Sequence, residues 1–207
     1  DESESRGLGD VYKRQAGISP FLMKTSEFLN SNKGFIASLN PGAIGLKCNA
    51  HELLDYAIEY KFSAISPLLG DLIKFNEEER KTYLSKMQIN KIEFDSGGLP
   101  IDFRSTETKF LEGFKFLNKH LKTISSFKIP SFVTWIMPTH KSLTYRQNFE
   151  QHHNRLSKVA NVLEQEGLKL GLEYVGPKTL MVRDKYPFLH TIGAVSYTHL
   201  RAHETRI

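Results

Sequence analysis

The sequence predicts an α/β fold: part of a TIM (β/α)8 barrel, with about five of the eight βα units, in which parallel strands lie inside and helices outside. Short apolar runs alternate with amphipathic stretches from Ala43 onward, and no antiparallel hairpin signal joins two of them. Glycine, proline and polar residues follow several different strands instead of forming one glycine-rich phosphate loop, which favours a barrel over a doubly wound sheet.

The first unit is expected to begin with a strand at 43–47 (AIGLK). Asn49 then stands where a helix N-cap belongs, and Glu52, three residues later, completes a capping box. The helix is expected to continue to about Tyr60, because apolar residues recur on one face at helical spacing. The second unit opens with a strand at 64–69 (AISPLL), whose far end is weakened by a proline.

The pattern repeats in the second and third units. Asn76 is expected to cap a second helix whose first turn carries three glutamates, because negative charge is favourable at a helix N-terminus. A third strand is expected at 91–95 (KIEFD), ending at Gly97-Gly98. Ser105 or Thr106 then opens the third helix.

A fourth strand is expected at 131–137 (SFVTWIM) and a long fourth helix at about 144–166. Gly167 is a helix stop. A fifth strand follows at 168–175 (LKLGLEYV). Five units of roughly 30 residues each, counted from the first strand, end near Gly193.

The two ends of the chain encode the same DNA, read in opposite directions. One permitted coding of 195–205 (VSYTHLRAHET), read on the opposite strand one base in, gives SRGLGDVYKR and a base that can begin Gln15. Because this string resembles the transposase adapter used to make sequencing libraries, both flanks are expected to be non-native. The expected organisation is adapter at 1–15, a disordered lead-in or signal-peptide remnant at 16–37, the N-terminal part of a barrel at 38–193, and adapter at 194–207.

Composition bounds the partners. The net charge of +5 is spread along the chain. No Lys/Arg stripe with interleaved aromatics is seen, which argues against nucleic acid. The single cysteine, Cys48, excludes a disulfide framework and a cysteine-based zinc site. No apolar run is long enough to span a bilayer, so no membrane partner is expected.

Glu173 is the first candidate for chemistry, because it lies inside an apolar strand shortly before the strand ends (GLEYVGP). At that position of a barrel strand, a carboxylate points into the barrel mouth. Charged side chains are rarely buried without a partner, so a metal ion is the expected partner. The alternative is an ion pair with a buried Lys or Arg.

Four further residues are candidates for substrate binding. His140, in MPTH after the fourth strand, could bind a substrate oxygen or help to hold a metal; a surface-loop histidine is the alternative. Trp135 could stack on a sugar ring, although core packing is the default for an indole in a strand. Lys178 could reach an anionic or polyhydroxy substrate, with a solvated lysine as the alternative, and His190 lies in a loop after the fifth strand.

Two other groups of residues are expected to be structural. Asp95, and Asp102 with Arg104 in the loop after Gly97-Gly98, either fix the loop by a salt bridge or meet the substrate, and the structural role is favoured. His152 and His153 are neighbours on the fourth helix and do not share a face, which argues against a two-histidine metal site there.

The segments SLNPGAIGLKC, GGLPIDFR, WIMPTH, GLEYVGPKTL and YPFLHT, taken together, resemble the sugar phosphate isomerase/epimerase family of xylose isomerase-like barrels. The resemblance covers about 38–191. It implies that Glu173 is a ligand of a divalent metal, Mn²⁺, Mg²⁺ or Co²⁺, and one of the catalytic bases. The remaining ligands, an Asp, a His and a second Glu, are expected on strands six to eight, which this sequence does not contain.

The resemblance implies an isomerase or epimerase that moves a proton through a metal-stabilised enediolate. The alternatives are a lyase of the same barrel family, similar to inosose or dehydroshikimate dehydratases, and a non-catalytic sugar-binding barrel. The expected partner is a small-molecule sugar or sugar phosphate. A homo-oligomer is left open, as is the compartment, between the cytoplasm and export from a bacterial cell. With one expected metal ligand of four, the printed chain is not expected to be active by itself.

Overall fold

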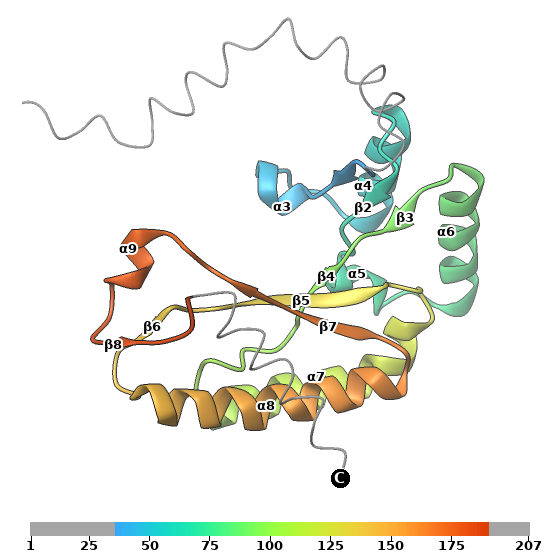
Figure 1. Ribbon diagram of the computed structural model, residues 1–207. Helices are drawn as coiled ribbons and strands as arrows, with labels where there is room; N and C mark the ends of the chain where they lie inside the picture. Colours follow the sequence, from blue (N-terminus) through green and yellow to red (C-terminus); the bar gives the residue numbers. More distant parts are fainter. Residues whose placement is uncertain (1–35, 191–207) are drawn as a thin grey trace, which may run out of the picture.

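The computed structural model describes residues 36–190, in which strands and helices alternate along the chain (Figure 1). The predictions for 1–15 and 194–207, and nearly all of that for 16–37, lie outside the described residues. The parallel strands form two three-stranded sheets, β1 (Ser38–Leu39), β2 (Ala64–Ile65) and β3 (Glu93–Phe94) in the first, and β4 (Gly97–Gly98), β5 (Ser131–Ile136) and β7 (Lys169–Tyr174) in the second.

The two sheets are consecutive parts of one row of strands. Only Asp95 and Ser96 separate β3 from β4, so the chain passes directly from the first sheet into the second. Neighbouring strands follow each other in chain order and run parallel, with helices between them, which is the arrangement of a TIM barrel. Within residues 36–190 the row does not close into a barrel. The predicted α/β fold with parallel strands is confirmed.

The helices are α3 (Pro41–Ile44), α4 (Ala50–Glu59), α5 (Leu69–Leu72), α6 (Glu77–Ile89), α7 (Glu107–Ser125), α8 (Tyr145–Gln165) and α9 (Lys178–Met181). The predicted helix signals are confirmed. The Asn49 capping box is present at the start of α4, and Asn76 and Thr106 cap α6 and α7. Gly167 follows α8 with a φ of 71°, a conformation that favours glycine.

The first strand was predicted at the wrong place. It is Ser38–Leu39, and the predicted range 43–47 contains the end of α3 and the turn after it. The Asn40 side chain accepts a hydrogen bond from the Ala43 N–H at 3.2 Å, so Asn40 and the proline after it begin a helix here. The apolar run that suggested a strand is not buried, because Ile44 is 68 % exposed.

One other detail of the prediction was wrong, and one pairing was not foreseen. Gly97-Gly98 does not only end a strand: it is β4, which pairs with β5, and a Cβ on Gly97 would lie 2.8 Å from the Phe132 ring. An antiparallel pair that is not a hairpin is also present, between β6 (Thr139–His140) and β8 (Tyr186–Pro187), and it was not predicted from the sequence. Its two strands come from loops far apart in the sequence and have two residues each, too few for a period-two pattern to be recognised.

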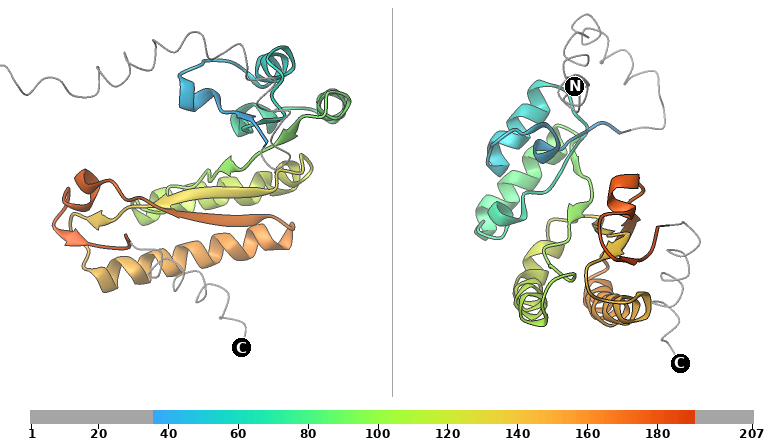
Figure 2. Two further views of the ribbon diagram at one scale, coloured as in Figure 1. Left: turned by 45° about the horizontal axis from the view of Figure 1, so that its top comes forward. Right: turned by 90° about the vertical axis from the view of Figure 1, so that its left-hand side faces the viewer.

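The helices cover one face of the strands and leave the other open (Figure 2). On β5, Phe132 and Ile136 are buried in the hydrophobic core, whereas Val133 and Trp135 are 41 % and 48 % exposed. Phe132 belongs to the core cluster formed with α4, α6, α7 and α8. The odd-numbered positions of β5 therefore lie on the face that a closed barrel turns inward.

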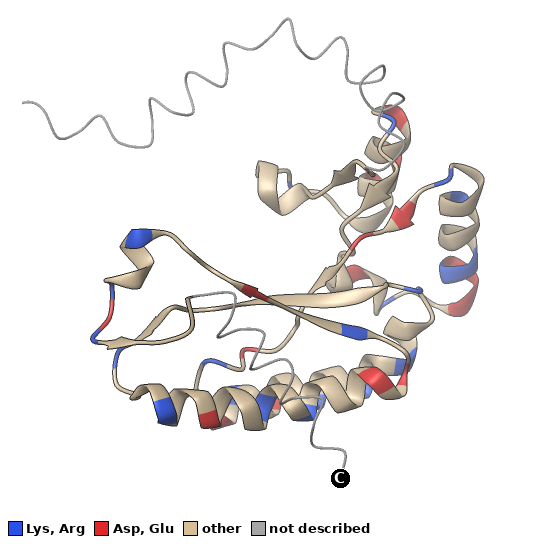
Figure 3. Cartoon of the chain, in the orientation of Figure 1, with Lys and Arg blue, Asp and Glu red and all other residues tan. Residues whose placement is uncertain are grey.

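Lys and Arg residues are mixed with Asp and Glu residues along the described helices and loops (Figure 3). None of the described helices is both long enough and apolar enough to cross a membrane.

Candidate functional site at the carboxyl ends of the strands

Glu173 and Trp135 lie side by side on the inner face. They are register partners on the neighbouring strands β7 and β5, and each stands next to the last residue of its strand. Parallel register partners project to the same side of a sheet, so Glu173 shares the open face with Trp135. The Glu173 side chain is exposed, and within residues 36–190 it has no hydrogen bond or ion pair. The alternative of an ion pair with Lys or Arg is not seen there.

Trp135 is not a core residue, because its indole is half-exposed. The Arg104 guanidinium carbon lies 4.5 Å from the centroid of the Trp135 ring and 4.7 Å from that of Phe103. Arg104 Nη1 also donates to the Trp135 carbonyl oxygen and, at 3.4 Å, to Thr134 Oγ1. Arg104 therefore holds the Trp135 indole and its backbone in place. The sequence had favoured a salt bridge between Arg104 and Asp102 instead. Burial lowers the pKa of Arg104.

A second polar group lies further along the row of strands, where β1, β2 and β3 are neighbours. The hydroxyls of Ser38 and Ser66 both donate to Asp95 Oδ2, the latter at 2.8 Å. Asp95 Oδ1 is buried and has no partner among the described residues. Beside it, the Ser96 and Ser131 hydroxyls are 2.7 Å apart. Sequence reasoning did not identify these serines, because a hydroxyl in a strand carries no pattern.

His140 lies on β6, just past the end of β5, in the wall of a cavity of about 390 Å³. Its Nδ1 accepts hydrogen bonds from the backbone N–H groups of Ser142, at 3.1 Å, and Leu143, at 2.8 Å. Since both amides are donors, Nδ1 carries no proton, and the ring proton is on Nε2. His140 can therefore donate one hydrogen bond through Nε2.

Lys178 and His190 are both at the surface. Lys178 is the first residue of α9 and is exposed. His190 is exposed, and its Nδ1 lies 2.8 Å from the Phe188 carbonyl oxygen. Neither residue lines the cavity that contains His140. The structure thus brings Trp135 and Glu173 together and leaves the roles of all five candidates as predictions.

On the inner face, the exposed carboxylate of Glu173 is available to a metal ion. No group of three or more His, Cys, Asp or Glu side chains within residues 36–190 could hold a metal ion. Glu173 fits the part of a single ligand, because its oxygens are unpartnered and carboxylate oxygens bind divalent metals. These residues do not form a complete coordination shell.

Two residues of α8 in the same cavity as His140 were missed. Asn148 and His152 are each 2 % exposed, and both face the cavity. Their spacing of four residues places them on one face of the helix. Sequence reasoning considered His152 only together with His153, although polar residues four apart on a helix with an apolar stripe were the available signal.

Comparisons with solved structures agree with this arrangement. A xylose isomerase domain protein from Alicyclobacillus acidocaldarius subsp. acidocaldarius matches with a TM-score of 0.67 and 20 % identity, over 81 % of this chain and 59 % of that one. A D-psicose 3-epimerase solved in the presence of D-fructose matches with a TM-score of 0.55 and 10 % identity, over 69 % and 53 %. IolI, solved with a bound zinc atom, matches with a TM-score of 0.56 and 15 % identity, over 67 % and 52 %.

These matches define the class: the described residues form an open part of a TIM barrel. The solved structures that share this fold include a xylose isomerase domain protein and an epimerase, so the fold that the resemblance implied is confirmed. A probable 3-DHS dehydratase, AsbF from Bacillus anthracis, has the same fold (TM-score 0.55, 15 % identity, 67 % of this chain and 52 % of that one). The chain spans about half to three-fifths of the length of these proteins. It matches no protein-family model and no curated protein sequence.

Proposed function

We propose that this chain belongs to a sugar or sugar phosphate isomerase or epimerase that depends on a divalent metal, with Glu173 as a metal ligand and base. The observation that carries the proposal is the position of Glu173: a carboxylate on the inner face without a partner among residues 36–190, one residue from the carboxyl end of the last parallel strand described. Barrel enzymes collect their catalytic groups at these strand ends. The fold matches include an epimerase, which supports the reaction class.

The chemistry is divided between the metal and the protein. A bound divalent metal supplies polarisation of the substrate carbonyl. The Glu173 carboxylate takes the proton from the carbon next to that carbonyl. Return of the proton to the neighbouring carbon isomerises the sugar, and return to the opposite face of the same carbon epimerises it.

Trp135 and Arg104 position the substrate beside this carboxylate. The exposed face of the indole gives the sugar ring an apolar surface next to Glu173. Arg104 fixes the indole by lying over the ring and by binding its backbone carbonyl. This contact keeps the stacking surface in register with the base.

The experiment is proton exchange at carbon, followed by NMR in D₂O with Mn²⁺ present, on the protein from the complete reading frame and a panel of ketoses and aldoses. We expect Glu173→Gln to reduce exchange by a factor of at least about 100, since it removes the base. The matched control is Glu59→Gln, at the exposed end of α4, which should exchange at the wild-type rate. Wild-type exchange in Glu173→Gln would contradict the role of the carboxylate.

A lyase is the second candidate, supported by the fold match to a probable dehydratase. A dehydratase also begins by removing a proton next to a carbonyl, so exchange alone does not separate the two reactions. The product does: an isomerase or epimerase conserves the mass of the sugar, whereas a dehydratase lowers it by one water. A barrel that binds sugars without catalysis would give no exchange with any substrate of the panel.

A further inference from the structure

We infer that the cavity between α8, β6 and the loop after β4 is a binding subsite for a hydroxyl-bearing anion, such as a phosphorylated or carboxylated polyol. In this subsite His152 accepts a hydrogen bond from the hydroxyl of the ligand, and Arg104 and Lys141 bind its anionic group. The inference deepens the proposed function and rests on it for the claim that the ligand is a substrate. The binding itself does not require that function.

The first observation is a buried acceptor without a partner. The His152 side chain is 2 % exposed, and its Nδ1 lies 2.8 Å from the Asn148 carbonyl oxygen, so Nδ1 carries the proton and donates to it. The other ring nitrogen, Nε2, is buried and has no hydrogen-bond partner among residues 36–190. An unsatisfied buried polar atom is costly, and native proteins contain few of them.

The protonation state of His152 makes Nε2 an acceptor. Burial is the largest cause of a shift that lowers the pKa of His152 to about 4, and the neighbouring charge of Arg104 acts in the same direction. At neutral pH the ring is therefore uncharged, and Nε2 presents a lone pair. A ligand that satisfies it must bring a hydrogen-bond donor, and a hydroxyl is the donor that an anionic sugar carries.

The ring cannot easily turn away from this position. Phe103 contacts it edge-on with centroids 5.2 Å apart, and Phe188 lies at 4.9 Å on another side. With Nδ1 bound to the helix backbone and both neighbours aromatic, His152 keeps its orientation in the cavity wall. A preorganised acceptor loses little conformational freedom when a ligand binds.

The charges of the cavity favour an anion. Its acidic residue, Asp184, is ion-paired with Arg183 at 3.0 Å and accepts from Thr139 at 3.3 Å, so these two charges cancel. Arg104 and Lys141 are further cations of the lining, and neither forms an ion pair within residues 36–190. The charge of Asp102, outside the lining, also acts on Arg104. Within residues 36–190, Arg104 donates hydrogen bonds only through Nη1. Its other N–H groups are therefore available to a phosphate or carboxylate.

His140 completes the recognition of a polar ligand. Its Nδ1 is occupied by two backbone amides, so its Nε2–H, which has no partner among residues 36–190, is a donor on the same cavity wall. A ligand that both donates and accepts, as a hydroxyl does, can use His152 and His140 together. A volume of about 390 Å³ accommodates a small phosphorylated polyol.

The test is calorimetric titration of the full-length protein, without metal, with three probes: sn-glycerol 3-phosphate, inorganic phosphate and glycerol. We expect glycerol 3-phosphate to bind about fivefold more tightly than phosphate, the worth of one hydroxyl hydrogen bond, and glycerol not to bind measurably. Arg104→Gln should weaken both anions by about tenfold or more. His152→Phe should remove the fivefold advantage and leave phosphate binding unchanged.

The matched control is His51→Phe in the separate cavity between α4 and α6, which should leave all three titrations unchanged. A measurement on the wild-type protein needs no folded variant: the ¹⁵N resonance of His152 Nε2 should move when glycerol 3-phosphate is added. Equal affinity for phosphate and glycerol 3-phosphate, or an unmoved Nε2 resonance, would overturn the inference. Because Glu173→Gln should still bind the probe, failure of the subsite and failure of the isomerase proposal are distinguishable.

Discussion

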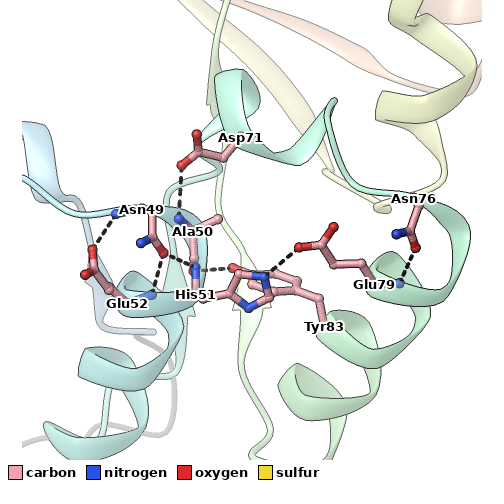
Figure 4. A network of polar contacts seen from close by, with 8 residues as sticks. All are labelled: Asn49, Ala50, His51, Glu52, Asp71, Asn76, Glu79 and Tyr83. Carbon is pink, nitrogen blue, oxygen red and sulfur yellow. Dashed lines mark hydrogen bonds and ion pairs between the residues drawn. The ribbon is translucent and has the colours of Figure 1, made fainter.

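Two cavities of similar size differ in how they use a histidine. The first, of about 370 Å³, lies between the starts of α4 and α6, and the second, of about 390 Å³, lies beside α8. In the first, His51 Nε2 is 3.1 Å from Glu79 Oε1, Asp71 accepts the Ala50 N–H at 3.1 Å, and Tyr83 donates to the Ala50 carbonyl (Figure 4).

The polar atoms of the first cavity are thus used by the protein itself. Asn49 and Glu52 form a capping box, and the His51 ring also stacks on Phe75 at 5.0 Å. In the second cavity, His152 keeps a buried acceptor without a partner among the described residues. Whether the buried polar atoms of a cavity already have hydrogen-bond partners, more than the cavity volume, therefore distinguishes a structural network from a candidate binding site.

The largest effect is expected where α8 holds the wall of the second cavity. Arg155 Nη1 donates to the carbonyls of Phe103, at 2.8 Å, and Ser105, at 2.7 Å, and the loop that they fix carries Arg104. Arg155→Met leaves both carbonyls without a partner, so we expect the free energy of unfolding to fall by about 4 kcal/mol. Urea unfolding measures this.

The control for Arg155 lies on the same helix. Arg146 pairs with Glu150 at the surface, and its side chain is 89 % exposed, so Arg146→Met should cost less than about 0.5 kcal/mol. Similar losses in the two variants would mean that Arg155 is not a buried anchor of the loop. Arg155→Met should also weaken phosphate binding, because Arg104 loses its support.

The second prediction concerns how the free energy of unfolding depends on pH through His152. The His152 pKa is about 4 in the folded state and about 6.5 when unfolded, so the unfolded state binds the extra proton between these values. Its contribution to stability is present above pH 6.5 and is lost as the pH falls through 4, by about 3 kcal/mol at pH 4 relative to pH 7. Urea unfolding at pH 7, 5.5 and 4 measures the loss.

His152→Phe should lose about 3 kcal/mol less than the wild type over this range, since phenylalanine does not titrate. If His152→Phe and the wild type fall in parallel, His152 is not kept neutral by burial.

The smallest effect tests the first cavity as a structural network. Asn49→Ala removes the side chain that accepts from the backbone N–H groups of His51 and Glu52, at 2.9 and 3.0 Å. We expect a loss of about 1 kcal/mol in the free energy of unfolding, with no change in anion binding. Asn49→Asp retains the accepting oxygen, so its free energy of unfolding should stay within roughly a few tenths of a kcal/mol of the wild-type value. A change in phosphate affinity in Asn49→Ala would show that the cavities are coupled.

Helix starts were predictable because a cap is a local interaction. Asn49, Asn76 and Thr106 each bond to a backbone N–H within three residues, so a short stretch of sequence contains the whole signal. The first strand was not predictable in the same way. Ser38–Leu39 has two residues, and what makes it a strand is pairing with Ala64–Ile65.

The candidate site divides along the same line. The place of Glu173 near the end of an apolar strand predicted that its carboxylate points into the barrel mouth, and its register partner Trp135 lies on the same face. The sequence favoured core packing for the Trp135 indole. In the structure the ring is half-exposed and contacts Arg104, so a residue of the loop after β4 meets a residue of β5. The two residues are far apart in the sequence, so no periodic pattern of neighbouring residues indicates this contact.

By itself, the sequence determined the alternation of strands and helices, the helix caps and the side of the sheet on which Glu173 lies, because each depends on residues a few positions apart. The tertiary structure alone decided that His152 is neutral, enclosed by Phe103 and Phe188, and left with a ring nitrogen that has no partner among residues 36–190. Desolvation depends on which distant segments exclude water from a group, and only the folded chain brings those segments together.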